Sequence, residues 1–109
     1  MPSSIYQGVS VTLPSANTVF KLLTLVNAIA GYETLGRAEA VTLQNDPANA
    51  ASNISVGDSG ISATNRAAKL VTGQSMEIRA IGRGTSFIDA IYFRSDTAGV
   101  IVNVGILQN

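Results

Sequence analysis

The chain lacks cysteine, histidine and tryptophan altogether, and the first two absences exclude much of the usual active-site chemistry. Without cysteine there is no disulfide framework, no thiolate nucleophile and no thiolate metal site. Without histidine there is no imidazole base for a Ser-His-Asp triad. We therefore expect no enzymatic activity, no bound metal and no cofactor.

Charged residues are scarce and balanced. They form 13% of the 109 residues, about half the share in an average soluble domain, and seven basic residues offset seven acidic ones. A chain of zero net charge has no field that steers it toward nucleic acid or an anionic membrane, so we expect neither partner. The basic residues are scattered among acidic ones, which is typical of solvated surface. They are Arg66, Lys69, Arg79, Arg83 and Arg94.

A weakly charged surface has little protection against association. This suits a subunit of an assembly, so we expect a homo-oligomer, a dimer or trimer; a low-charge monomer is the alternative. The N-terminus has neither the basic start nor the apolar run of a signal peptide, and no stretch approaches the ~20 apolar residues of a membrane span. We expect a soluble protein made in the cytoplasm.

From residue 41 onward, short apolar stretches alternate with turns rich in Gly, Asn, Asp and Ser. Turn signals about every 8 to 12 residues are typical of a β-sandwich or open barrel. We therefore predict a mainly β protein, a single β-sandwich or jelly-roll-like domain over residues 1–109. The predicted strands are residues 8–13, 39–45, 54–56, 70–71, 76–80, 87–94 and 100–107.

Two segments modify this pattern. Residues 87–94 are apolar on both faces, which predicts a strand inside a sheet or beneath a partner. Residues 18–30 place apolar side chains at helical spacing, which predicts one short helix, although Thr and Val favour strands and a pair of strands is the alternative. We expect Ser15 or Asn17 to cap this helix and Gly31 to stop it.

Residues 57–60 read Gly-Asp-Ser-Gly, which is similar to the motif around the nucleophile of chymotrypsin-like serine proteases. That mechanism needs a histidine, and nothing in the sequence fixes Lys21 or Lys69 near Ser59 as a substitute base. We interpret the motif as a turn in which Asp58 and Ser59 bond the local backbone.

Other polar residues suggest binding sites only weakly. One stretch is rich in side chains with oxygen atoms that could bind calcium: Asp46, Asn49, Asn53 and Asp58. Their spacing matches no calcium-binding loop, and Asx turns explain them better. A sugar-stacking face could use Tyr6, Tyr32 or Tyr92, although we favour core packing for Tyr92. Gly82, Arg83 and Gly84 indicate a hairpin turn rather than a phosphate-binding loop.

The order of short motifs supports a family resemblance. A strand ending in Asn45 is followed by Ile-Ser-Val-Gly-Asp-Ser at residues 54–59, Leu-Val-Thr-Gly-Gln-Ser at residues 70–75, Ile-Tyr-Phe at residues 91–93 and the final strand. Over about residues 40–107 the chain resembles small virion structural proteins of tailed bacteriophages. The closest role is the head decoration, or cement, protein, a small β-sandwich that binds the outer capsid as dimers or trimers.

The resemblance implies a non-enzymatic protein of the capsid surface, made in the host cytoplasm, that binds the major capsid protein and stabilises the head. The alternatives are a tail, fibre or baseplate component, or a small carbohydrate-binding module. The family supplies no catalytic motif, and residues 18–30 have no counterpart in its pattern.

The expected assembly contacts come from two places. Residues 1–5 are interpreted as an extended arm or a tail, and the second face of the last strand is not strongly polar. The expected contact residues are Pro2, Ser3, Ser4, Ile5, Tyr6, Ile101 and Leu107.

Overall fold

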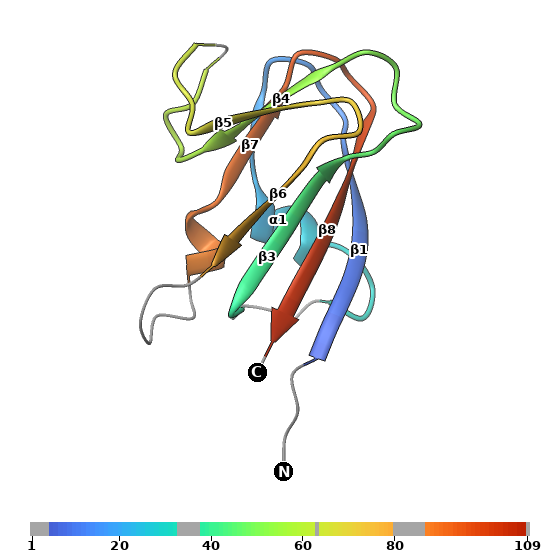
Figure 1. The fold of residues 1–109 in the computed structure, drawn as a ribbon, viewed down its shortest axis with the longest axis vertical. Coiled ribbons are helices and arrows are strands. Elements are labelled where there is room, and N and C mark those ends of the chain that lie inside the picture. The colour runs from blue at the N-terminus through green and yellow to red at the C-terminus, as the bar shows by residue number, and fades with distance from the viewer. Residues whose placement is uncertain (1–4, 33–37, 63, 80–86, 109) are drawn as a thin grey trace.

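Two antiparallel sheets of four strands each lie face to face (Figure 1). The computed structural model describes residues 5–32, 38–62, 64–79 and 87–108. Sheet A, in the spatial order β1-β8-β3-β6, consists of β1 (Ile5–Leu13), β8 (Val100–Gln108), β3 (Ala40–Asn45) and β6 (Ser75–Arg79). Sheet B, in the order β2-β7-β4-β5, consists of β2 (Val19–Lys21), β7 (Tyr92–Ser95), β4 (Asn53–Gly57) and β5 (Ala68–Val71).

Successive strands belong to different sheets, except for β4 and β5, which are hydrogen-bonded neighbours. This strand order is that of an eight-stranded jelly roll, a double-sheet fold built from two Greek keys. The predicted β-sandwich is therefore confirmed.

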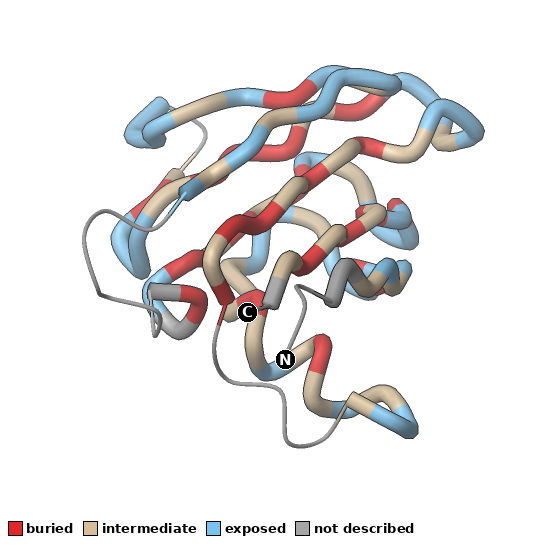
Figure 2. The backbone as a smooth tube through the Cα atoms, turned by 60° about the horizontal axis from the view of Figure 1, so that its bottom comes forward, coloured by how far each residue is buried: buried red, intermediate tan, exposed pale blue. Residues whose placement is uncertain are grey.

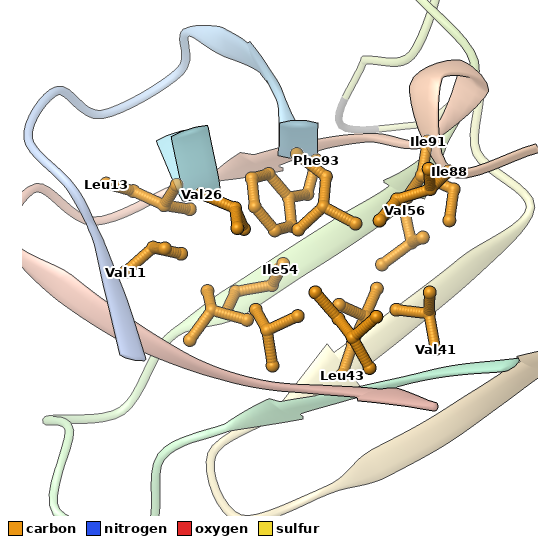
Figure 3. Packing of buried hydrophobic residues seen from close by; sticks show 14 of the residues in the cluster. Val11, Leu13, Val26, Val41, Leu43, Ile54, Val56, Ile88, Ile91 and Phe93 are labelled. Atoms are coloured by element: carbon orange, nitrogen blue, oxygen red, sulfur yellow. The ribbon is translucent and has the colours of Figure 1, made fainter. Parts of the chain in front are cut away.

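Alternation along the strands directs every second side chain into the space between the sheets. On β8 the alternate residues from Val100 to Ile106 are buried, as the sequence predicts, and the same alternation is visible along both layers in Figure 2. They join Ile54 of β4 and Phe93 of β7 in one continuous cluster (Figure 3). Burial of each such side chain stabilises the fold by about 1.5 to 3 kcal/mol, so this cluster is the main source of stability.

The helix predicted over residues 18–30 is wrong in extent, because the segment begins as a strand. β2 pairs with β7, and only α1 (Leu22–Asn27) is α-helical. Phe20 of β2 lies opposite Phe93 of β7 in this pairing. A cross-strand aromatic pair stabilises a strand here, and this tertiary contact overrides the helical spacing.

The turns on either side of β2 and α1 use left-handed backbone. Asn17, expected as a helix cap, has a φ of 56°, and its N–H donates to the Ser95 carbonyl at 2.7 Å. Gly31 has a φ of 93° beyond the end of α1. α1 buries Leu22 and Val26 against the core. No helix in the described residues is long and apolar enough to cross a membrane.

The strand predicted over residues 87–94 is wrong in its first half. Phe87–Ala90 forms a 3-10 helix, η1, and β7 starts only after it. Ile88 and Ile91 are both buried, and their three-residue spacing matches the period of a 3-10 helix. The apolar residues on both apparent faces therefore reflect a change from helix to strand.

The first strand starts earlier than predicted. Ile5 and Tyr6 belong to β1 and pair with Gln108 and Leu107 of β8, so residue 5 is part of the sheet rather than an arm. Outside the described residues lie Pro2, Ser3 and Ser4, and also Gly82, Arg83 and Gly84 of the predicted hairpin turn.

A buried side-chain amide joins loops at one end of the sandwich. Asn45, the last residue of β3, is fully buried, and its Nδ2 donates to the carbonyl oxygens of Ser52 at 3.3 Å and Leu70 at 3.2 Å. Its Oδ1 accepts the Asn49 Nδ2 at 2.8 Å. Because an amide both donates and accepts, it can serve neighbours of both kinds from one buried position.

Replacement of this amide tests its role. Asn45→Asp keeps the side-chain shape but places a carboxylate against the Ser52 and Leu70 carbonyls, so we expect a loss of about 3 kcal/mol in the free energy of unfolding. Urea denaturation at neutral pH measures it. Asn49→Asp, at a half-buried position, should lose about 1 kcal/mol. Equal stability of the Asn45 variant and the native protein would contradict the assignment.

Candidate functional site

The Gly-Asp-Ser-Gly step at residues 57–60 is a turn, as predicted, but of the two expected side chains only Asp58 bonds the local backbone. The Asp58 carboxylate accepts the Gly60 N–H at 2.8 Å, and the Asp58 carbonyl accepts the Ile61 N–H at 3.2 Å. At Gly57 a Cβ would lie 2.5 Å from the Ile61 Cγ2 and 3.3 Å from the Ala67 backbone nitrogen. Close packing and local hydrogen bonding therefore explain the motif without a catalytic role.

Ser59 lies exposed in this turn, and neither candidate lysine is hydrogen-bonded to it within the described chain. Lys69 is on β5 and Lys21 on β2, the two opposite edge strands of sheet B. A serine nucleophile needs its base within hydrogen-bond reach. The described arrangement does not provide that contact.

Two substitutions separate packing from chemistry in this turn. Gly57→Ala should lower the free energy of unfolding by about 1 to 3 kcal/mol, because Ile61 and the Ala67 backbone must move. Ser59→Ala should change it by less than about 0.5 kcal/mol. Thermal or urea unfolding of both variants checks this. The assignment fails if the Ser59 variant is the less stable of the two.

The oxygen-rich residues of the sequence bind different partners and do not form one site. The two Asn49 side-chain groups clamp β8: Nδ2 donates to the Ile101 carbonyl at 2.8 Å and Oδ1 accepts the Ile101 N–H at 3.0 Å. The Asp46 carboxylate accepts the Ala48 N–H at 2.8 Å in an Asx turn. The described residues contain no cluster of three or more acidic side chains that could hold a metal ion.

Asn53 and Asp96 form a second clamp, between β4 and the turn after β7. The Asn53 backbone N–H donates to Asp96 Oδ1 at 2.9 Å, and the Asn53 Nδ2 donates to Asp96 Oδ2 at 2.8 Å. The pKa of Asp96 is lowered below the usual 3.8, mainly by the hydrogen bond from the Asn53 backbone N–H. Slight burial opposes this shift, whereas hydrogen bonds from the Asn53 side-chain amide and the Thr97 hydroxyl add to it.

Acid should weaken this clamp. Because the pKa of Asp96 is lowered in the folded state, its contribution to stability is present above the unfolded pKa of about 4 and is lost as pH falls through the folded value. We expect the unfolding free energy of Asp96→Ala to depend less on pH below about pH 4 than that of the native protein. Urea denaturation between neutral and acidic pH measures both curves; identical acid slopes would contradict the role of Asp96.

The outer face of sheet A is almost free of charge. The sequences of β1, β8 and β3 contain no charged residue. On β6 the outward residues Glu77 and Arg79 are joined by a 3.1 Å salt bridge. Most of this face therefore consists of small, amide, hydroxyl and apolar side chains.

A row of polar side chains crosses all four strands of sheet A. In register order it consists of Ser10, Asn103, Gln44 and Ser75. The Ser10 hydroxyl donates to Asn103 Oδ1 at 2.8 Å, and the Asn103 Nδ2 donates to Gln44 Oε1 at 3.0 Å. Beside this row lies a shallow groove of about 470 Å³, over the paired residues Gly8 and Gly105.

The predicted assembly residues of β1 and β8 map onto sheet A in part. Tyr6 and Leu107 are register partners, and Leu107 is half-buried. Ile101 is 37% exposed on β8. The sequence therefore predicted residues of one sheet, but it did not predict the groove, because the pairing of Gly8 with Gly105 joins opposite ends of the chain.

Three of the four edge strands are poor templates for another strand. At the free edge β1, the Tyr32 hydroxyl donates to the Gly8 carbonyl at 3.0 Å. Of the other edge strands, β2 and β5 have three and four residues, and β6 has five residues with two charges. Short or charged edges resist strand addition, so at β2, β5 and β6 the faces are the better candidates for contact. β1 is longer and uncharged.

The outer face of sheet B differs from that of sheet A because it is basic. Lys21, Arg94 and Lys69 lie on β2, β7 and β5, and the register places Ser55 of β4 between Arg94 and Lys69. Tyr92 is half-buried on this face rather than in the core, since its neighbour Phe93 points inward. In the sequence these basic residues are scattered, because the order of the strands in the sheet is not visible there.

Comparisons with known proteins add little to this description. No family model matches the chain, and no curated protein matches it. One similar solved structure comes from the work "Bacillus endospore appendages form a novel family of disulfide-linked pili". It has 11% sequence identity and a TM-score of 0.42, over 98% of this chain and 90% of the other.

Proposed function

We propose that this protein is a non-enzymatic virion structural protein, a capsid decoration or cement protein. It binds the outer surface of the major capsid protein lattice and stabilises the head, after synthesis in the host cytoplasm. The observation that carries the proposal is the outer face of sheet A, where three adjacent strands contain no charged residue. One carboxylate, that of Asp46, reaches the polar row of this face and accepts the Asn103 Nδ2 at 3.1 Å. The rest of the surface can be buried without leaving a charge unpaired.

The size of this face favours several copies acting together. The nine-residue strands β1 and β8 are about 30 Å long, and three neighbouring strands span about 14 Å, an area of roughly 400 Å². A stable interface buries about 800 Å² on each partner. A dimer or trimer that presents two or three such faces to a repeated lattice gains the missing affinity through avidity.

The fold is compatible with this role but does not select it. Jelly rolls occur in viral capsid proteins and in lectins, and function resides in the site rather than in the fold. The polar row from Ser10 to Ser75 beside a groove of about 470 Å³ favours a second candidate, a carbohydrate-binding module, because uncharged amides and hydroxyls bond sugar hydroxyls. A tail, fibre or baseplate component would use the same surface.

A matched pair of substitutions tests the docking face. Ile101 on sheet A and Val71 on sheet B are each 37% exposed, so both accept a charge at similar cost to folding. We expect the native protein to co-sediment with capsids assembled without it. Ile101→Asp should reduce its affinity by about tenfold or more, because a charge is buried at the interface, while Val71→Asp should bind as the native protein does.

Three results would contradict this proposal in different ways. Absence of binding by the native protein to intact capsids excludes decoration. If only the Val71→Asp variant lost binding, the docking face would be on sheet B instead. Saturable binding on a glycan array, lost with Asn103→Ala, supports the carbohydrate module instead, and electron microscopy of the particle separates a head position from a tail position.

A further inference from the structure

A pocket of about 170 Å³ lies on the outer face of sheet B, opposite the proposed docking face. Side chains from β4, β5, β7 and their adjoining segments form it. The lining residues are Asn53, Ser55, Arg66, Lys69, Arg94 and Asp96.

Three cationic side chains converge on this pocket from three segments. Arg94 on β7 and Lys69 on β5 are both register partners of Ser55 on β4. Since neighbouring strands are about 4.8 Å apart, the two basic residues stand about 10 Å apart with Ser55 between them. Arg66, in the segment before β5, lines the same pocket. Three cations gathered around so small a volume repel one another, and an anion would remove that repulsion.

The floor of the pocket is formed by Ser55. Ser55 is 3% exposed, and it points to the outer face because Ile54 and Val56 on either side are buried in the core. Within the described part of the chain, the buried side-chain oxygen that lacks a partner is that of Gln7, so the Ser55 hydroxyl is open to solvent. It can therefore donate to a molecule in the pocket that it lines.

Asp96 is the acidic group of the pocket, and its oxygens are already engaged. It accepts hydrogen bonds from the Asn53 backbone and amide and from the Thr97 hydroxyl at 2.9 Å. It forms no salt bridge with Arg94 or Lys69. The lining of the pocket therefore contains three basic residues and one acidic residue.

We infer that this pocket binds a compact oxyanion, a phosphate or sulfate group, either free or as an ester. Lys69 and Arg94 neutralise its charge, and the Ser55 hydroxyl donates to one of its oxygens. Arg66 also lines the pocket and makes a further interaction of its own. The Arg94 Nη2 donates to Asn17 Oδ1 at 3.1 Å, which fixes the side chain. Because a guanidinium has five N–H donors, this bond leaves others for the ligand. The inference is independent of the proposed docking of sheet A.

The test is a titration followed by amide NMR and calorimetry at low ionic strength. Inorganic phosphate, inorganic sulfate and glucose 6-phosphate are the three ligands, and they distinguish the free ion from the ester. We expect saturable binding with shifts at Ser55, Lys69 and Arg94. Lys69→Gln should weaken it about fivefold, and Ser55→Ala about tenfold, the loss of one hydrogen bond to a charged group.

The matched control is Arg79→Gln, which removes an exposed cation of sheet A and should leave binding unchanged. Ser55→Ala should be at least as stable as the native protein without phosphate, because it removes a hydroxyl that is open to solvent. A structural role for Ser55 predicts the opposite. Unsaturated shifts spread over all basic residues, or tighter binding of acetate than of phosphate, would overturn the inference.

Discussion

The whole structure depends on the burial of one face of each strand in a single core. In this jelly roll the inner faces of the two sheets meet in one cluster that contains Phe93, Ile54 and the alternate residues of β8. Period-two alternation supplies those residues, and the same alternation leaves the other side chains of every strand outside. Inner positions therefore determine the fold, while outer positions are available for function. Because the two outer faces belong to different sheets, they can differ in chemistry.

Side-chain amides help to fix the loops that connect the strands. The chain has no cysteine and only three prolines, so covalent and conformational restraints on its loops are few. Asn45 binds the Ser52 and Leu70 carbonyls, Asn49 binds both backbone groups of Ile101, and Asn53 binds Asp96. In each case an amide satisfies the backbone or side chain of a distant segment. This explains the Asn-rich loops, which the sequence alone also offered as oxygen ligands for a metal.

The sequence predicted those parts of the structure that local periodicity determines. The alternation of residues 100–107 and the turn at residues 57–60 were predicted correctly, because each depends on neighbouring residues. The elements at residues 18–30 and 87–94 were predicted incorrectly, since each segment changes from one secondary structure to another within a few residues. The strand at the start of residues 18–30 depends on the pairing of Phe20 with Phe93, which no local sequence pattern shows. Register likewise creates the basic pocket, because alternation puts Lys69 and Arg94 on outer faces without making them neighbours.

The zero net charge of the chain describes its long-range field and little else. Charges on the surface are screened over about 8 to 10 Å in physiological salt, so a balanced total means that nothing steers the protein from a distance. Interactions within a pocket act at shorter range and depend on which charges are neighbours. Sheet A pairs its outward Glu77 with Arg79, whereas the outer face of sheet B brings Arg94 and Lys69 together around Ser55. A balanced composition is therefore compatible with both proposals, an uncharged docking face on sheet A and an anion pocket on sheet B.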